Sequence, residues 1–381
     1  MRVRYVGEVG RGTGYGVAAT QLCAALIRAG VRLEIRSLAP VEMIKTANLP
    51  LPVASAICSD RELDPNPDAV IVHTLPADCG RVLELMGYGK NGPEKHPRLI
   101  AYTTWETLQA PAAITDALGW FDQVWVPSSA NETAFLEVGV NRLRVLPHTF
   151  DEETYTARKG IYATPDAEPF KFYYVGAWTQ RKNPTGVIRA FCHAFTRADP
   201  VQLLLQCSGA SLESIAAAAG SSGMGSERAP SIRPSVAPLT DEGILDLHRT
   251  ADCFVTASRG EAWNLPAFDA MLAGRHVIAP RGQGSDDFLE DTSAALYFST
   301  HGIAQLDVRV TSQAGGKFGL ECMGAQGLTA KSIWLEPDLL HLAHYMQIAA
   351  RDGIDRLHGP DPRQRFGYAA VAKLAMSYLK E

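Results

Sequence analysis

Short β-branched runs alternate with longer segments of helical period along this chain, and the alternation occurs twice. This pattern is typical of β-α units that build a parallel sheet. In the first half we expect helices at 16–30 and 129–139, and strands at 3–7, 32–38, 68–75, 98–104, 123–128 and 142–148. Six strands make a complete doubly wound domain, so the first half predicts a Rossmann-like domain over residues 1–165.

The same pattern restarts after a polar, proline-containing stretch. We expect helices at 185–195, 241–251 and 266–273, and strands at 170–176, 201–209, 253–258 and 276–280. The predicted fold is therefore α/β, with a second Rossmann-like domain over 166–355 and a C-terminal helix at 356–381 that packs back on the first domain. Two such domains that face a cleft would bring the carboxyl ends of both sheets to it, where open α/β sheets bind ligands.

Composition excludes several classes of protein. The 36 Lys and Arg against 41 Asp and Glu give a net charge of −5, which argues against a surface built mainly for a nucleic-acid backbone. No apolar run approaches the roughly 18 residues of a membrane-spanning helix. The seven cysteines contain no C-x-x-C pair, which fits neither a disulfide framework nor a structural zinc site. We expect a cytoplasmic protein without a transmembrane segment.

The first strand leads into a turn with five glycines, GEVGRGTGYG, over residues 7–16. Glycines at the start of a helix let the backbone approach a ligand and present N–H groups to an anion or hydroxyl. Gly12 and Gly14 are therefore candidate binding residues. The spacing is not that of a dinucleotide fingerprint or a Walker A loop, and a tight turn without a ligand remains the alternative.

The sequence SRGEAWNLPAFDAM, residues 258–271, follows a predicted strand and enters a predicted helix. Pro266 suits the first helical turn, so Asn264 and Leu265 present backbone amides at a positive helix end, which is a ready phosphate site. Glu261 precedes the helix and Asp269 lies one turn inside it. Two carboxylates on either side of a phosphate site predict a nucleotide-sugar site. Trp263 either stacks on that ligand or packs in the core.

This region resembles retaining glycosyltransferases of the two-domain GT-B architecture, specifically those similar to family 4, also called glycosyl transferases group 1. The family signature is two acids separated by seven residues. Glu261 and Asp269 have that spacing, with Asp in place of the usual second Glu. The following LAGRHVIAP also matches the family.

The segment YVGAWTQRKN, residues 174–183, also resembles the family. Gly176 matches the family glycine, and Lys182 falls on the family's diphosphate-binding lysine. The arginine that normally follows the glycine is Ala177 here, and Arg181 is the expected replacement. In the first half, the glycine-rich turn, VWVPSSANETAFLEVGV and VLPHTFD look like family segments as well, so the resemblance covers most of residues 1–300.

The resemblance implies transfer of a sugar from a nucleoside diphosphate sugar to an acceptor hydroxyl, with retention of configuration. The implied catalytic residues are Glu261, Lys182, Arg181 and Glu106. The implied donor-binding residues are Gly12, Gly14, Gly176, Trp263, Asn264, Leu265, Asp269 and His73. Glu106 and His73 are alternatives for a family histidine that touches the donor sugar. No cofactor is expected, since the nucleoside diphosphate sugar is the donor substrate. No metal is expected, because the chain has no Asp-x-Asp motif.

The acceptor and the oligomeric state stay open. A saccharide, a lipid-linked or small-molecule acceptor and a hydroxymethylated DNA base all fit, although the net charge does not indicate a nucleic acid. Two other functions fit the same residues. One is a non-catalytic module that binds a nucleotide sugar, and the other is a nucleotide-sugar epimerase.

Overall fold

The computed structural model describes the chain in ranges that leave short gaps. The described residues are 1–10, 12–38, 44, 49–59, 61, 63–88, 96–153, 169–221, 227–290, 295–312, 318–322, 329–352 and 361–381. The chain divides into two compact units. The first unit comprises Met1–Glu152, Gln305–Ser332 and Asp361–Glu381, and the second comprises Glu153–Ala304 and Ile333–Pro360. The expected boundaries at 165/166 and 355/356 lie outside the described residues.

The first unit contains a six-stranded parallel sheet in the order β2-β1-β3-β4-β5-β6. Its strands are β1 Arg2–Gly7, β2 Arg32–Ser37, β3 Ala69–His73, β4 Arg98–Tyr102, β5 Gln123–Val126 and β6 Leu143–Val145. The chain order reverses beside β1, which is the strand order of a doubly wound domain. The six strands expected from the sequence are confirmed, each shorter than predicted at one or both ends except β1, which begins one residue earlier.

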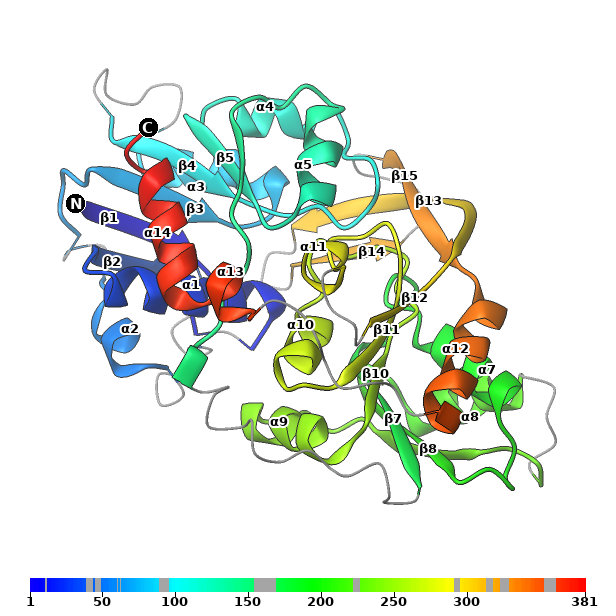
Figure 1. The fold of residues 1–381 in the computed structure, drawn as a ribbon. Helices are drawn as coiled ribbons and strands as arrows, with labels where there is room; N and C mark the ends of the chain where they lie inside the picture. The colour runs from blue at the N-terminus through cyan, green and yellow to red at the C-terminus, as the bar shows by residue number, and fades with distance from the viewer. Residues whose placement is uncertain are drawn as a thin grey trace. The chain divides into compact units, whose positions relative to one another are not determined.

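Helices cover both faces of this sheet. They are α1 Gly14–Arg28, α2 Leu51–Ser55, α3 Pro76–Leu85, α4 Ile114–Leu118, α5 Ser129–Leu136, α13 Arg363–Phe366 and α14 Tyr368–Tyr378. The C-terminal α14 lies along α1 in Figure 1, and buried Val371 and Ala375 join the core beneath it. Side chains of α3, α4 and α5 join the core of the opposite face.

The second unit repeats this architecture with the sheet order β12-β11-β10-β7-β8-β9. Its strands are parallel and comprise β7 Phe170–Ala177, β8 Val201–Ser208, β9 Ser231–Ser235, β10 Cys253–Val255, β11 His276–Pro280 and β12 Ala295–Phe298. Its helices are α7 Pro184–Ala194, α8 Leu212–Gly220, α9 Asp241–Thr250, α10 Leu265–Leu272, α11 Asp286–Leu289 and α12 Leu339–Asp352. The predicted α/β fold with two Rossmann-like domains is thus confirmed.

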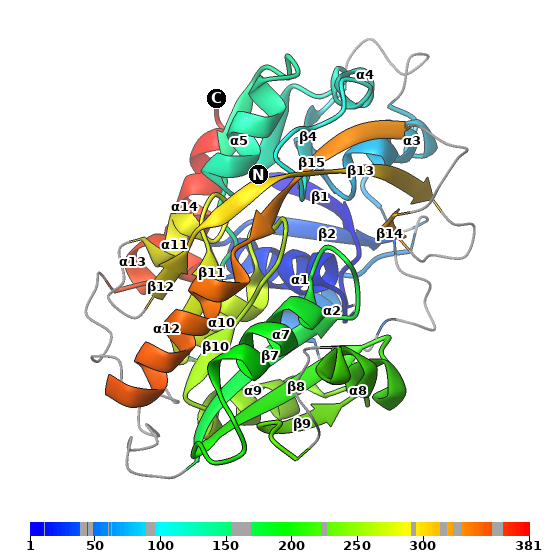
Figure 2. The ribbon, with the colours of Figure 1, turned by 90° about the vertical axis from the view of Figure 1, so that its right-hand side faces the viewer.

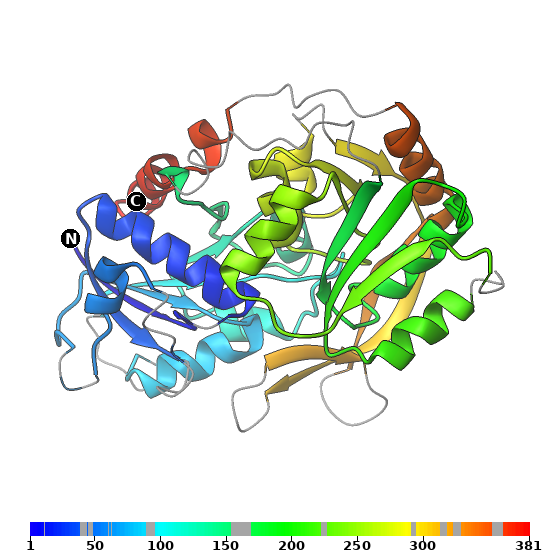
Figure 3. The same cartoon turned by 90° about the horizontal axis from the view of Figure 1, so that it is seen from below.

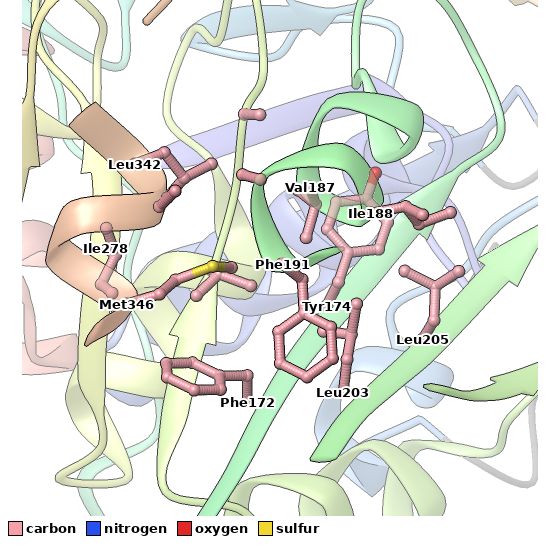
Figure 4. Close-up of a cluster of buried hydrophobic side chains, with 14 of the residues drawn as sticks. Phe172, Tyr174, Val187, Ile188, Phe191, Leu203, Leu205, Ile278, Leu342 and Met346 are labelled. Atoms are coloured by element: carbon pink, nitrogen blue, oxygen red, sulfur yellow. The ribbon is translucent and has the colours of Figure 1, made fainter. Parts of the chain in front are cut away.

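The sheet of the second unit has helices on both faces. Figure 2 shows α7 and α12 side by side, and in Figure 3 α9 and α8 lie on opposite sides of the strands. Alternate residues of β7 serve the two faces, because side chains alternate along a strand. Phe172 and Tyr174 pack against Phe191 of α7 and Met346 of α12 in the cluster of Figure 4. Tyr173 points to the other face and bonds His248 of α9.

A three-stranded sheet lies outside both doubly wound sheets, and the sequence analysis assigned no elements to it. Its strands are β13 Thr300–Ser312, β14 Phe318–Cys322 and β15 Thr329–Pro337, in the order β14-β13-β15. The pairing of β13 with β14 is antiparallel. Within the described residues, no helix is long and apolar enough to span a membrane.

Candidate functional site

Two loops lie next to each other at the carboxyl edge of the second sheet. One follows β7 and runs to Asn183, and the other follows β10 and runs to Asn264. The strands β7 and β10 are neighbours in the sheet, so their following loops emerge side by side. The two sequence segments that resembled the glycosyltransferase family are therefore adjacent in space, although about 80 residues separate them.

The two loops meet in an ion cluster. The ammonium group of Lys182 donates to both carboxylate oxygens of Glu261, at 2.7 Å to Oε1 and 2.8 Å to Oε2. Arg181 Nη1 lies 3.2 Å from Oε2 of the same carboxylate and donates to the carbonyl of Gly260 at 2.7 Å. The structure thus brings together three of the four predicted catalytic residues.

Within this cluster the Glu261 side chain is more deeply buried than those of Arg181 and Lys182. The side chain of Glu261 is 4% exposed, while those of Arg181 and Lys182 are 15% and 20% exposed. Burial by itself would raise the pKa of Glu261. The positive charges of Lys182 and Arg181 outweigh that effect, so the pKa of this carboxyl lies below its ordinary value. The cluster at neutral pH is two cations around one carboxylate.

Hydrogen bonds to backbone carbonyls fix the two loops to each other. The N–H of Arg259 donates to the carbonyl of Arg181 at 2.8 Å, and Ser258 Oγ donates to the same carbonyl at 3.2 Å. From the first loop, Asn183 Nδ2 donates to the carbonyl of Ala257 at 3.0 Å. The positions of Lys182 and Glu261 therefore depend on the pairing of the loops as well as on the ion pair.

The start of α10 supplies a helix N-terminus beside the acid. Its N-cap Asn264 lies in the left-handed region, with φ 74° and ψ 70°, and its side chain accepts the N–H of Ala267. Leu265 is the first helical residue, and its N–H has no acceptor within a helix. Pro266 has no N–H. The helix start carries partial positive charge at a short sequence distance from Glu261.

The other predicted residues of this unit have distinct surroundings. Trp263 is 2% exposed, with its ring centroid 5.3 Å from Phe268 and 4.9 Å from Phe288. Of the two roles left open for Trp263, these contacts support packing. Asp269 is half-buried on α10, and after the larger effect of burial its charge contributes to the raised pKa of Tyr173. The Asp269 carboxylate therefore lies close enough to Tyr173 of β7 to affect the pKa of that tyrosine.

Gly176 has a packing reason to be glycine. A Cβ at this position would lie 2.4 Å from Oη of Tyr174, which is closer than real Cβ contacts allow. The same Tyr174 hydroxyl donates to the carbonyl of Lys182 at 3.5 Å. The glycine therefore makes room for a side chain that supports the loop of the ion cluster.

The remaining predicted residues lie in the first unit. Gly12 precedes α1, and a Cβ there would meet nothing within 4 Å. Gly14 is the first residue of α1, whose N-cap Thr13 bonds Glu8 at 2.9 Å. Glu106 follows β4 and is half-buried. The described residues therefore give no packing reason for a glycine at position 12.

His73 ends β3 inside a group of tyrosines. Its Nδ1 lies 2.5 Å from Tyr5 Oη, and its ring stacks on Tyr102 with centroids 4.3 Å apart. Its Nε2 is buried and has no hydrogen-bond partner among the residues that the structure describes. Burial, with a smaller contribution from His148, lowers the pKa of His73 well below its ordinary value. This histidine is neutral at physiological pH and is covered by protein.

A hollow of about 650 Å³ lies elsewhere in the first unit, between α1 and α14. Its lining residues are Ala25, Arg28, Ala29, Glu152, Tyr368, Ala369, Lys373, Met376, Ser377 and Lys380. None of them is a predicted site residue. Three of the predicted catalytic residues meet in the ion cluster, so we place the candidate site there.

The loop after β11 also contributes to the site, although no residue in it was predicted. Gln283 is 3% exposed and donates from Nε2 to the carbonyl of Ser258 at 2.6 Å. Its Oε1 is buried, with no hydrogen-bond partner in the described part of the chain. The N–H of Gly284 donates to the carbonyl of Glu261 at 2.9 Å. The available signal was the RGQGS turn after the strand at 276–280, because loops after neighbouring parallel strands share one edge of the sheet.

Comparisons with solved structures show where this fold occurs. The sucrose-phosphate synthase from Thermosynechococcus elongatus matches with TM-score 0.63 and 17% identity, over 100% of this chain and 98% of that one. An α,α-trehalose-phosphate synthase (UDP-forming) from Burkholderia xenovorans matches with TM-score 0.56 and 13% identity, over 83% and 74%. A glycosyltransferase involved in avilamycin A biosynthesis matches with TM-score 0.57 and 14% identity, over 100% and 97%.

The chain also matches TarM, of which it spans about half the length, 51%. No family model and no curated protein sequence matches the chain. At these identities the comparisons define the class of fold. The chain has the GT-B fold, with its two Rossmann-like domains.

Proposed function

We propose that the protein is a glycosyltransferase that moves a sugar from a nucleoside diphosphate sugar to an acceptor hydroxyl, with retention at the anomeric carbon. The observation that carries this proposal is the cluster of Lys182, Arg181 and Glu261 beside the start of α10, at the carboxyl edge of β7 and β10. Two cations and a helix N-terminus suit a diphosphate. A carboxylate suits sugar hydroxyls.

The proposed role of the cations is to stabilise the leaving diphosphate. Negative charge grows on the diphosphate oxygen as the bond to the sugar breaks, and fixed positive groups stabilise the transition state most where charge develops. Lys182 and Arg181 supply full charges, and the N–H of Leu265 supplies the helix end. These groups together give a metal-independent way to assist departure.

The proposed roles of the two acids follow from their places on the segment. Glu261, in the loop before α10, accepts hydrogen bonds from hydroxyls of the donor sugar. Asp269, one turn inside the helix, accepts from the ribose. Two structural neighbours, a UDP-forming synthase and a glycosyltransferase, support a nucleotide-sugar donor by analogy of fold.

For retention we propose a front-face reaction without a covalent intermediate on the protein. The bond from the anomeric carbon to the diphosphate oxygen breaks, and the bond to the acceptor oxygen forms on the same face. The acceptor proton passes to the departing diphosphate. In the first unit, Gly12, Gly14 and His73 stay predicted donor contacts, and Glu106 stays a predicted catalytic residue.

Thermal unfolding with UDP, GDP, ADP, CDP, TDP and NAD tests the donor half of this proposal. A ligand at 100 times its dissociation constant stabilises by about 2.7 kcal/mol, which raises the melting temperature measurably. We expect a shift with one or two of the diphosphates and none with NAD. No shift with any diphosphate would contradict the proposal. A shift without release of sugar from the matching donor would instead favour a binding module.

A further inference from the structure

The carboxylate of Glu261 is already engaged by protein donors. An ionised carboxylate offers about four acceptor positions. Lys182 donates to each oxygen of Glu261, the Ser258 side chain bonds the same carboxylate, and Arg181 forms an ion pair with Oε2 at 3.2 Å. A sugar hydroxyl that approaches Glu261 must therefore replace a charge-assisted contact, which is stronger than a neutral hydrogen bond.

We propose that Glu261 and the diphosphate of the donor compete for Lys182 and Arg181, and that the diphosphate thereby releases Glu261 to bind the sugar. This inference rests on the proposed function and adds a rule of specificity. The site binds the sugar through Glu261 only when the sugar arrives attached to a phosphate-bearing group.

Exposure gives the order in which a ligand meets these groups. The side chains of Lys182 and Arg181 are 20% and 15% exposed, while that of Glu261 is 4% exposed. An anion from solution therefore reaches the cations before it reaches the acid. A diphosphate carries more negative charge than one carboxylate, so it binds the two cations more strongly at equal distance.

The backbone limits the change to the side chains. The carbonyl of Glu261 accepts the N–H of Gly284 at 2.9 Å, and the carbonyl of Gly260 accepts from Arg181 at 2.7 Å. The N–H of Arg259 holds the carbonyl of Arg181 at 2.8 Å. With both loops held in this way, a rotation of the Lys182 side chain vacates one acceptor position on each oxygen of Glu261.

The test is calorimetric titration of the full chain and of Glu261→Gln. The ligands are inorganic pyrophosphate, the nucleoside diphosphate that gives the largest thermal shift, and its glucose derivative. Competition predicts that Glu261→Gln binds pyrophosphate and the nucleoside diphosphate at least about fivefold more tightly than the wild type, which is the lower end of typical coupling between two bound groups. The advantage of the sugar derivative over the bare diphosphate should fall.

The matched control is Glu242→Gln, which removes one negative charge from the same unit. Glu242 is exposed and pairs with Arg249 at 2.7 Å. This variant should bind all three ligands as the wild type does. If Glu261→Gln does not fold, Glu261→Asp serves instead, because a carboxylate shorter by one methylene withdraws from Lys182. It should tighten diphosphate binding to a smaller extent.

The outcomes separate this inference from the proposed function. Unchanged or weaker binding of both diphosphates to Glu261→Gln, or to Glu261→Asp where that variant is used, overturns the competition and leaves the proposed function intact. Tighter pyrophosphate binding without binding of any nucleoside diphosphate supports the competition and overturns the proposed function. Binding of neither probe by any of these proteins overturns both.

Discussion

Asn183 and Asn264 hold the same place in two helices of the second unit, and both lie in the left-handed region. Asn183 is the N-cap of α7, with φ 49° and ψ 48°, and Asn264 is the N-cap of α10, with φ 74° and ψ 70°. Each side chain accepts an N–H of the first turn, and each helix has a proline at its start. The two caps end the loops that carry Lys182 and Glu261, so they set the geometry of the ion cluster.

Replacing Asn264 tests this backbone requirement. Asn264→Ala removes the cap and places a Cβ residue that rarely adopts φ above zero in the left-handed region, so we expect a loss of about 2 kcal/mol. Asn264→Gly keeps the conformation and should lose only a few tenths. Urea unfolding of both variants measures the difference. Equal stability of the two would show that the conformation at this cap does not matter.

Lys182→Ala should remove most transfer activity. The ammonium group is placed to stabilise the leaving diphosphate, and loss of one such contact typically lowers the rate about 10²- to 10³-fold. Steady-state rates with the matching donor measure the effect.

The control for that variant is Lys171→Ala, because Lys171 lies near the amino end of β7, at the opposite edge of the sheet from Lys182, and its ammonium group donates to the carbonyl of Thr250 at 3.4 Å. Its rate should equal that of the wild type. A rate for Lys182→Ala within threefold of the control would remove Lys182 from the mechanism.

Chelation should leave transfer intact. Lys182, Arg181 and the start of α10 supply the positive charge that a divalent metal would otherwise supply to a diphosphate. Activity after dialysis against EDTA should therefore match that of untreated protein. Loss on chelation, with recovery on addition of magnesium or manganese, would show that these groups do not suffice.

Substitution by alanine should lower the free energy of unfolding at one predicted glycine, Gly176, and leave it unchanged at another, Gly12. Gly176→Ala places a Cβ 2.4 Å from Tyr174 Oη, so the tyrosine must move and the free energy of unfolding should fall by about 1 to 3 kcal/mol. Gly12→Ala meets nothing within 4 Å and should fold with unchanged stability. Its affinity for the donor should nevertheless fall if the backbone of Gly12 approaches a ligand. Unchanged affinity would leave Gly12 as part of a tight turn.

Acid should destabilise the first unit through a buried histidine. Burial lowers the pKa of His148 from 6.5 to about 3. Between these values the unfolded chain binds a proton that the folded chain excludes, so stability falls as pH falls, by up to about 1.4 kcal/mol per pH unit. His148→Gln should show a shallower loss between pH 6 and 4. The exposed His96→Gln should keep the wild-type slope, and equal slopes for both variants would contradict this assignment.

The sequence by itself determined the two series of alternating strands and helices, because the spacing of apolar side chains along the chain is a local property. It placed α10 and its proline start within one residue, and it singled out Lys182 and Glu261 as chemistry-bearing residues. Strands β13 to β15 were not predicted, although the alternation in LDVRVTS is typical of an antiparallel strand.

Only the tertiary structure decided which of the singled-out residues meet. Lys182 and Glu261 are 79 residues apart, and they pair because β7 and β10 are neighbours in a sheet whose order no local pattern specifies. The same holds for Gln283, which reaches Ser258 from the next strand, and for His73, whose position at a strand end did not show that three tyrosines surround it. Strand order and burial arise from packing between distant segments, and that packing determines which predicted residues form one site.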